Sequence, residues 1–165
     1  MNENEQPDEF DKVAKAFVAH EAKKERWASE AEPYAERRPS EVTDIPWLYF
    51  KRKQGEYPAT TPKSGKWLLP LREEKLDEIW PAIRQATERG KLGQSSMAAT
   101  AKPNPRTSRS GEKMVCVFTY DWTDADDARR VRQALRDLGI TKKLRYKRDE
   151  DTRAGRYGAD YPYYE

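Results

Sequence analysis

The chain has 165 residues, of which 32 are Lys or Arg and 29 are Asp or Glu, with a single His and a single Cys. This length fits one domain of ordinary size with room for flexible tails. No apolar run approaches the ~20 residues that span a bilayer, and the acidic start differs from a signal peptide. One Cys and one His can build neither an internal disulfide nor a zinc cage. We therefore expect a cytoplasmic protein that needs no membrane, metal or cofactor.

Charge is unevenly distributed along the chain. Residues 1–32 carry five basic and nine acidic side chains, a balance of −4, so the remaining 133 residues carry +7 and the whole chain +3. A split of this kind suggests an acidic segment attached to a basic body. The sequence predicts an acidic amphipathic helix with a linker over residues 1–45 and a single α+β domain over residues 46–165.

The N-terminal segment has the apolar spacing of a helix over residues 8–31. Phe10, Val13 and Phe17 recur at helical intervals, and Trp27 extends the same stripe. His20 lies on the flank of this helix, where we expect it to face solvent. Residues 32–45 are rich in Pro, Arg and Ser and read as a linker.

The rest of the chain alternates short β-prone runs with helical stripes. Strands are expected at 46–50, 66–70, 94–101, 113–122 and 144–147, and helices around 76–88 and 123–138, with the aromatic tail 157–164 paired at an edge. Residues 102–113 read as a mobile basic loop, and Pro81 should kink its helix or start a turn. This order indicates an α+β fold: a curved, mostly antiparallel sheet backed by helices on one face. The other face would stay open and be lined by basic residues.

Most catalytic motifs are missing. The chain has no Gly-rich phosphate loop, dinucleotide fingerprint or nucleophile elbow. Asp124, Asp126 and Asp127 fall in the first turn of a helix, where carboxylates favour the positive end of the dipole, so capping explains them better than a metal. What remains is a set of cations beside strands, with two more in the loop after the last of them and two tyrosines: Lys66, Lys91, Lys102, Arg145, Lys147, Arg148, Arg153, Arg156, Tyr120 and Tyr146. Gathered on one concave face they would bind an anionic group; the alternative is a solvated sheet edge whose charges deter aggregation.

Four stretches of the sequence resemble a known family. They are Gly65-Lys66-Trp67-Leu68, Leu76-Asp77-x-x-Trp80 with Gly90-Lys91-Leu92-Gly93, Val115-Cys116-Val117-Phe118 with Asp121-Trp122-Thr123-Asp124, and Leu144-x-Tyr146-Lys147-x-Asp149 with Thr152, Gly155 and Tyr157. Over residues 45–160 the chain is similar to the uncharacterised basophilic-leukaemia-expressed protein family. The resemblance implies a fold similar to the cap-binding translation initiation factor. Cap binding does not carry over, because Trp67, Trp80 and Trp122 look like core, and Trp27 and Trp47 lack a carboxylate partner for a guanine edge.

A second resemblance, to phosphothreonine lyase domains, concerns activity. It implies Lys91 as the base and Lys66, Lys102, Tyr120 and Arg145 as phosphate ligands, with Lys147 beside them. Where those domains have Lys-x-His, this chain has Lys66-Trp67-Leu68, so the usual proton donor is absent. If the chain is catalytic, the resemblance implies a phosphate-eliminating carbon–oxygen lyase.

Three functional hypotheses follow from these observations. The first is a domain that binds a phosphorylated peptide or a small phosphate-bearing ligand in a basic concave site, with the lyase activity lost. The second is an RNA-binding module that uses the basic sheet face. The third is a non-catalytic interaction protein whose N-terminal helix docks a protein partner by Phe10, Phe17 and Trp27.

Overall fold

A computed structural model describes residues 8–104, 111–158 and 160–165 of the chain. Within these residues six strands form one curved sheet in the order β1-β3-β4-β2-β5-β6, and every neighbouring pair is antiparallel. The strands are β1 (Trp47–Lys51), β2 (Gly65–Leu71), β3 (Ser95–Ala99), β4 (Lys113–Thr119), β5 (Arg145–Arg148) and β6 (Tyr163–Tyr164). The predicted aromatic tail is thus paired at an edge, as β6 against β5.

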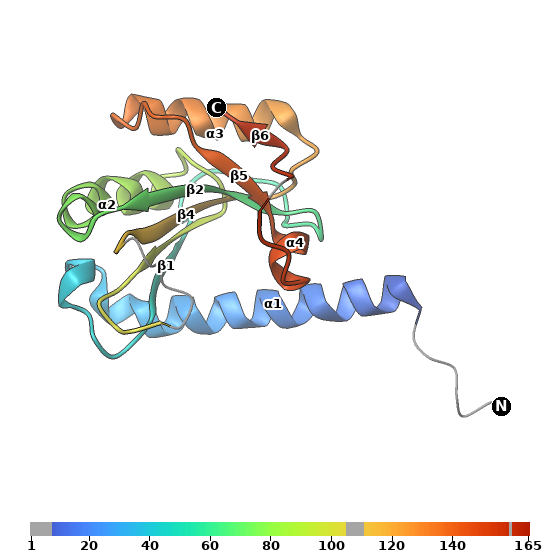
Figure 1. Ribbon diagram of the computed structural model, residues 1–165, viewed down its shortest axis with the longest axis horizontal. Coiled ribbons are helices and arrows are strands. Elements are labelled where there is room, and N and C mark those ends of the chain that lie inside the picture. Colours follow the sequence, from blue (N-terminus) through green and yellow to red (C-terminus); the bar gives the residue numbers. More distant parts are fainter. Residues whose placement is uncertain (1–7, 105–110, 159) are drawn as a thin grey trace.

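The described helices are α1 (Glu9–Ala31), α2 (Glu73–Glu88), α3 (Ala125–Asp137) and α4 (Asp149–Arg153), with 3-10 turns η1 (Glu32–Tyr34) and η2 (Pro39–Glu41) in the linker. Helices α2 and α3 lie on one face of the sheet and bury their apolar stripes there (Figure 1). The α+β class and the order of elements are therefore confirmed. Part of the predicted basic loop, residues 105–110, lies outside the described residues.

Local sequence explains where α3 begins and ends. Asp124 is its N-cap, and the carboxylate accepts a hydrogen bond from the backbone N–H of Asp127. Ala128, Val131 and Leu135 are buried against the sheet. Gly139 follows with a φ of 95°, a conformation that favours glycine after a helix. The acidic residues that open this helix therefore act as its cap, as their position predicts.

Helix α2 continues through Pro81 instead of ending there. The side chain of Pro81 is exposed. The carbonyl of Asp77, one turn back, loses the helical hydrogen bond that residue 81 would otherwise donate. No turn starts at Pro81, because α2 runs on to Glu88.

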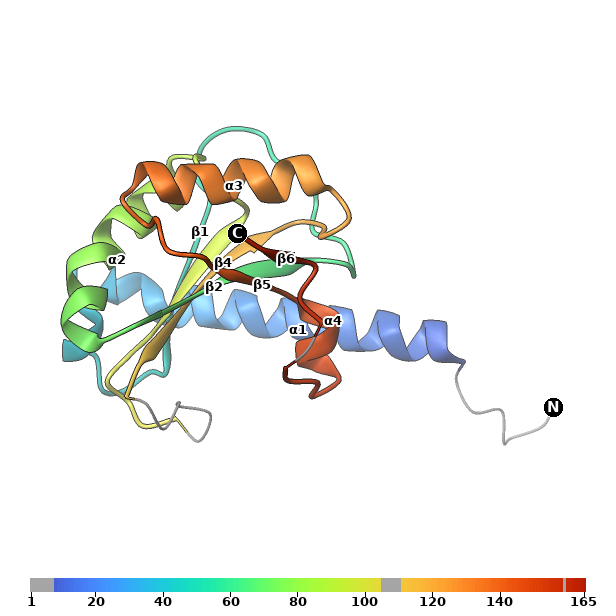
Figure 2. The ribbon, with the colours of Figure 1, turned by 45° about the horizontal axis from the view of Figure 1, so that its top comes forward.

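Helix α1 covers the second face of the sheet, which the sequence analysis expected to stay open. Trp27 and Ala28 pack against a second apolar cluster, formed by Tyr49, Met97, Cys116 and Phe118 on that face. Figures 1 and 2 show α1 crossing the sheet on the side opposite α2 and α3. The expectation of an open basic face was wrong, because aromatic and apolar side chains of β1, β3 and β4 bind the helix.

Only part of α1 is held in this way. Lys24 and Ala31 are its fully buried residues, both in its C-terminal half. Phe10, Val13 and Val18 are exposed on the half that runs out past α4 (Figure 1). Although α1 is long, neither it nor another described helix is apolar enough to cross a membrane.

Candidate functional site

Lys66 stands at the start of β2 with its side chain on the face that α1 covers. Its ammonium Nζ lies 2.6 Å from Asp149 Oδ1 and 2.7 Å from Thr152 Oγ1. Asp149 and Thr152 belong to the short helix α4, which directly follows β5, the strand paired with β2. This pairing of neighbouring strands brings a lysine and an aspartate 83 residues apart into contact.

Asp149 is shared by a second buried lysine, Lys24 of α1. The Nζ atom of Lys24 lies 3.6 Å from Asp149 Oδ2, and the two side chains are 3% and 0% exposed. The hydroxyl of Ser64 donates a 2.6 Å hydrogen bond to the same carboxylate. Burial by itself would raise the pKa of Asp149, but the charges of Lys66 and Lys24 outweigh it and hold the pKa well below its usual range. Asp149 is therefore ionised and anchors α1 to the sheet.

His20 and Arg153 lie beside this ion group at the line where α1 meets α4. The guanidinium carbon of Arg153 is 5.9 Å from the ring centre of Phe17, one turn before His20 on α1. Burial, followed by the nearby charge of Lys24, lowers the pKa of His20 to about 4, so its ring is neutral at neutral pH. The expectation that His20 faces solvent was wrong, because α1 turns this flank toward α4.

Two nitrogen atoms here are buried without a hydrogen-bond partner among the described residues, His20 Nδ1 and Arg153 Nη1. We call the group formed by these side chains the Asp149 cluster: His20, Lys24, Ser64, Lys66, Asp149, Thr152 and Arg153. It contains three permanent cations and one fully buried carboxylate, with Glu21 pairing Lys24 at the rim at 3.2 Å. The cluster therefore carries excess positive charge and unused hydrogen-bonding capacity.

Two more of the predicted site residues share the sheet face of Lys66. Lys147 of β5 pairs directly opposite Lys66, and Arg145 pairs opposite Leu68. Residues opposite one another in an antiparallel pair project to the same face. Lys66, Lys147 and Arg145 are therefore brought together along β2 and β5, as the sequence analysis expected.

The remaining predicted residues lie elsewhere. Lys91 follows α2, and its backbone carbonyl accepts a hydrogen bond from Arg130 of α3, on the other side of the sheet. Lys102 is exposed, and its ammonium is 3.2 Å from the carbonyl oxygen of Asp44. Tyr120 donates its hydroxyl to Asp124, the cap of α3, and this bond raises the pKa of Tyr120 to about 12. The structure thus does not gather Lys91, Lys102 and Tyr120 around Lys66.

The two tryptophans left over for cap binding pack on each other. The rings of Trp27 and Trp47 are 6.4 Å apart and inclined at 52°, and Trp27 also contacts Tyr49 at 6.2 Å. A flat base is sandwiched between parallel rings, which this pair does not offer. Trp27 also serves this internal contact instead of the predicted docking stripe, of which Phe10 remains exposed.

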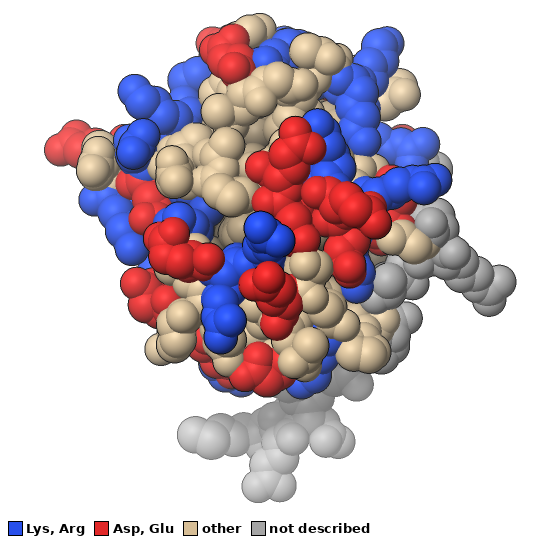
Figure 3. Space-filling view, turned by 90° about the vertical axis from the view of Figure 1, so that its left-hand side faces the viewer, with Lys and Arg blue, Asp and Glu red and all other residues tan. Residues whose placement is uncertain are grey.

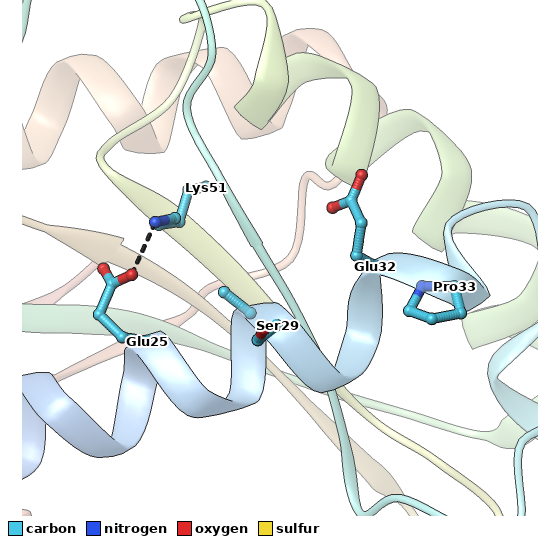
Figure 4. A pocket seen from close by; sticks show the side chains of 6 residues that line it. Glu25, Ser29, Glu32, Pro33 and Lys51 are labelled. Carbon is cyan, nitrogen blue, oxygen red and sulfur yellow. Dashed lines mark hydrogen bonds and ion pairs between the residues drawn. The ribbon is translucent and has the colours of Figure 1, made fainter.

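A separate open hollow of about 620 Å³ lies beside the C-terminal half of α1. Glu25, Ser29, Glu32 and Pro33 line it together with Lys51 of β1, whose ammonium is 2.9 Å from Glu25 (Figure 4). Its charges are mixed, and none of the predicted site residues lines it. The side of the molecule seen in Figure 3 likewise intersperses Lys and Arg with Asp and Glu and offers no uniformly basic patch.

These features define the structural class of the protein. It is an α+β protein whose antiparallel sheet has helices on both faces, with an ionic cluster buried under the N-terminal helix. Residues 58–152 match the family model described as Basophilic leukemia-expressed protein Bles03. The chain therefore belongs to that family. The matched stretch contains Ser64, Lys66, Asp149 and Thr152, whereas α1 lies outside it.

A solved structure similar to this one is described as a complex of C. elegans eIF4E-3 with the 4E-binding protein Mextli and cap analog. The sequences are 25% identical and the TM-score is 0.44. The overlap covers 56% of this chain and 54% of that chain, so the chain spans about half the length of its neighbour.

Proposed function

We propose that the protein binds an oxyanion-bearing ligand, a phosphorylated peptide or small phosphate compound, at the Asp149 cluster. The observation that carries this proposal is the pair of buried nitrogens without a partner among the described residues, His20 Nδ1 and Arg153 Nη1, beside two buried lysines. Buried polar groups are costly when unpaired. A phosphate oxygen would satisfy both and use the excess positive charge.

The groups at this site suit a phosphate in kind as well as in charge. Arg153 presents a guanidinium, which binds phosphate oxygens through parallel hydrogen bonds, and Lys66 supplies a point charge. His20 and Arg153 are only partly buried, so the line between α1 and α4 gives access to the cluster. We propose binding alone and no elimination reaction. Lys91, the base that the lyase resemblance implies, lies beside α3, on the other side of the sheet from the cluster.

His20 is the single histidine of the chain and gives a direct test. An NMR titration of its ring should give a pKa of about 4 for the free protein. Saturating inorganic phosphate or O-phosphothreonine should raise that pKa by about one unit or more, because a nearby negative charge favours the protonated ring. An unchanged pKa, compared with sodium chloride at the same ionic strength, would exclude an oxyanion at this cluster.

Two neighbouring arginines provide matched variants. Arg153→Gln should abolish the phosphate-induced shift, because it removes the guanidinium whose Nη1 has no partner among the described residues, although its Nη2 donates to the carbonyl of Pro62. Arg156→Gln removes the same charge three residues later from an exposed side chain bound to Asp151 and should leave the shift intact. Equal responses of the two variants would mean that phosphate acts through general charge and not through this site.

A further inference from the structure

A row of basic side chains projects from β5 and the residue pair before it. Leu144 and Tyr146 are buried in the core, so Lys143, Arg145 and Lys147 at the alternate positions project to the opposite face. Successive members of this row are about 6.6 Å apart along the strand. The row lies next to the sheet edge formed by β6 (Figure 1).

Each of these cations lies over the ring of a tail tyrosine. The distances from cation to ring centre are 5.2 Å for Lys143 over Tyr164, 5.3 Å for Arg145 over Tyr161 and 3.8 Å for Lys147 over Tyr157. Tyr157 and Tyr164 are nevertheless 63% and 58% exposed. We call these six side chains the β5–tail stripe.

The exposed rings are not what holds the tail in place. Leu144 and Glu165 exchange two backbone hydrogen bonds of 2.8 and 3.1 Å. The hydroxyl of Tyr163 donates to the carbonyl of Trp122 at 2.6 Å, and its ring packs on Trp67 and Tyr146. Since Tyr163 and the backbone anchor the tail, the solvent-facing rings of Tyr157 and Tyr164 are available for another contact.

Alternating cations and exposed aromatic rings have the chemistry that binds single-stranded nucleic acid. Bases stack on aromatic faces while Lys and Arg follow the phosphates, and stacking tolerates any base. A duplex hides its base faces, and an acidic peptide has no flat faces to stack on the tyrosines.

We infer that the β5–tail stripe binds single-stranded nucleic acid, with Tyr157 and Tyr164 stacking on bases and Lys143 and Arg145 contacting phosphates. The stripe lies on the same sheet face as Lys66, but on β5 and the tail, whereas the apolar cluster under α1 is formed by β1, β3 and β4. Its six side chains are not members of the Asp149 cluster, and the inference does not depend on the function proposed there.

Fluorescence anisotropy with a labelled 12-residue oligouridine or oligothymidine tests the inference on the full chain, and the two probes distinguish RNA from DNA. Tyr157→Ala with Tyr164→Ala should weaken binding about tenfold or more without changing the charge. Tyr157→Phe with Tyr164→Phe keeps the rings and should bind like the parent. Thermal melting of each variant by circular dichroism shows that the exposed substitutions leave the fold intact.

A charge-matched pair isolates the cations. Lys143→Ala with Arg145→Ala should weaken binding and lower the slope of log K against log salt by about 1.4, since single strands give about 0.7 for each phosphate contact. Lys75→Ala with Arg89→Ala removes the same charge from exposed positions near the two ends of α2 and should change binding less than about twofold.

Four results would overturn the inference. Two concern the variants: equal losses of affinity in the two charge-removing pairs, or unchanged affinity in the Tyr→Ala variant. The other two concern the ligand: a duplex that binds as tightly as the single strand, or polyglutamate that competes as well as an unlabelled single strand. The inference and the function proposed at the Asp149 cluster can fail independently. Arg153→Gln changes the Asp149 cluster but should leave oligonucleotide binding unchanged.

Discussion

Asp149 is a fully buried carboxylate that neutralises two buried lysines, Lys24 and Lys66. Asp149→Asn keeps the size of the side chain but leaves Lys66 without its counter-charge and Lys24 with Glu21 alone. We expect the free energy of unfolding in urea at pH 7 to fall by about 3–5 kcal/mol, the usual cost of breaking a buried ion pair from one side. Asp137→Asn, at the exposed end of α3, should change it by less than about 0.5 kcal/mol.

The lowered pKa of Asp149 also predicts in which direction the free energy of unfolding changes with pH. The pKa of Asp149 is lower in the folded protein than in the unfolded chain. Its stabilising contribution is therefore complete above the unfolded value of about 3.9 and is lost as the pH falls toward the lower folded value. The parent protein should lose this contribution below about pH 4 whereas Asp149→Asn should not, and parallel curves would contradict the assignment.

The residues of the candidate site could be predicted from the sequence only in part. Lys66 was recognisable as a candidate because it is a cation that opens a strand. Its partner Asp149 lies in the stretch Leu144-x-Tyr146-Lys147-x-Asp149, where no local feature marks it as the partner of Lys66. A contact over 83 residues has no local signature, and α4, with five residues, is too short to show a helical period.

The extent of α1 was predictable from its apolar spacing, and the structure confirms it to within one residue of the expected start. Its packing was not predictable, because one of its two buried residues is charged, Lys24, whereas the apolar Phe10 is 79% exposed. The apolar period of a helix indicates that a helix forms, but here partners from β1, β3 and β4 decide which part of it is buried.

The docking of α1 can be measured through the single cysteine of the chain. Cys116 lies in the apolar cluster under α1, and burial raises the pKa of its thiol to about 11, so it should react slowly with a disulfide reagent. Trp27→Ala removes the contacts with Trp47 and Tyr49. Losing this half-buried ring should weaken docking by about 2 kcal/mol and speed the labelling of Cys116 about thirtyfold.

Phe10→Ala serves as the control for this experiment, because its ring is exposed on the projecting half of the same helix. Its labelling rate should match that of the parent. If Cys116 reacts faster in Trp27→Ala only when urea unfolds the whole protein, α1 does not open on its own and the element is part of one cooperative core.

At the scale of the molecule, two helices back one sheet face while a third, attached more loosely, covers the other. Helix α2 buries six residues, whereas α1, although longer, buries two. The acidic segment and the basic body are joined by ion pairs such as Glu25 with Lys51 and Glu32 with Lys53. The uneven charge read from the sequence thus reflects contact between α1 and the body.

A ligand at the Asp149 cluster would touch both parts, because His20 and Lys24 belong to α1 whereas Lys66 and Arg153 belong to the body. By linkage, a ligand that binds only the closed form lowers the population of the open form by a factor of 1 + [L]/Kd. Inorganic phosphate at ten times its Kd should therefore slow the labelling of Cys116 about elevenfold, while chloride at the same ionic strength should not. If phosphate raises the pKa of His20 but leaves the labelling rate unchanged, it binds to α1 without bridging to the sheet.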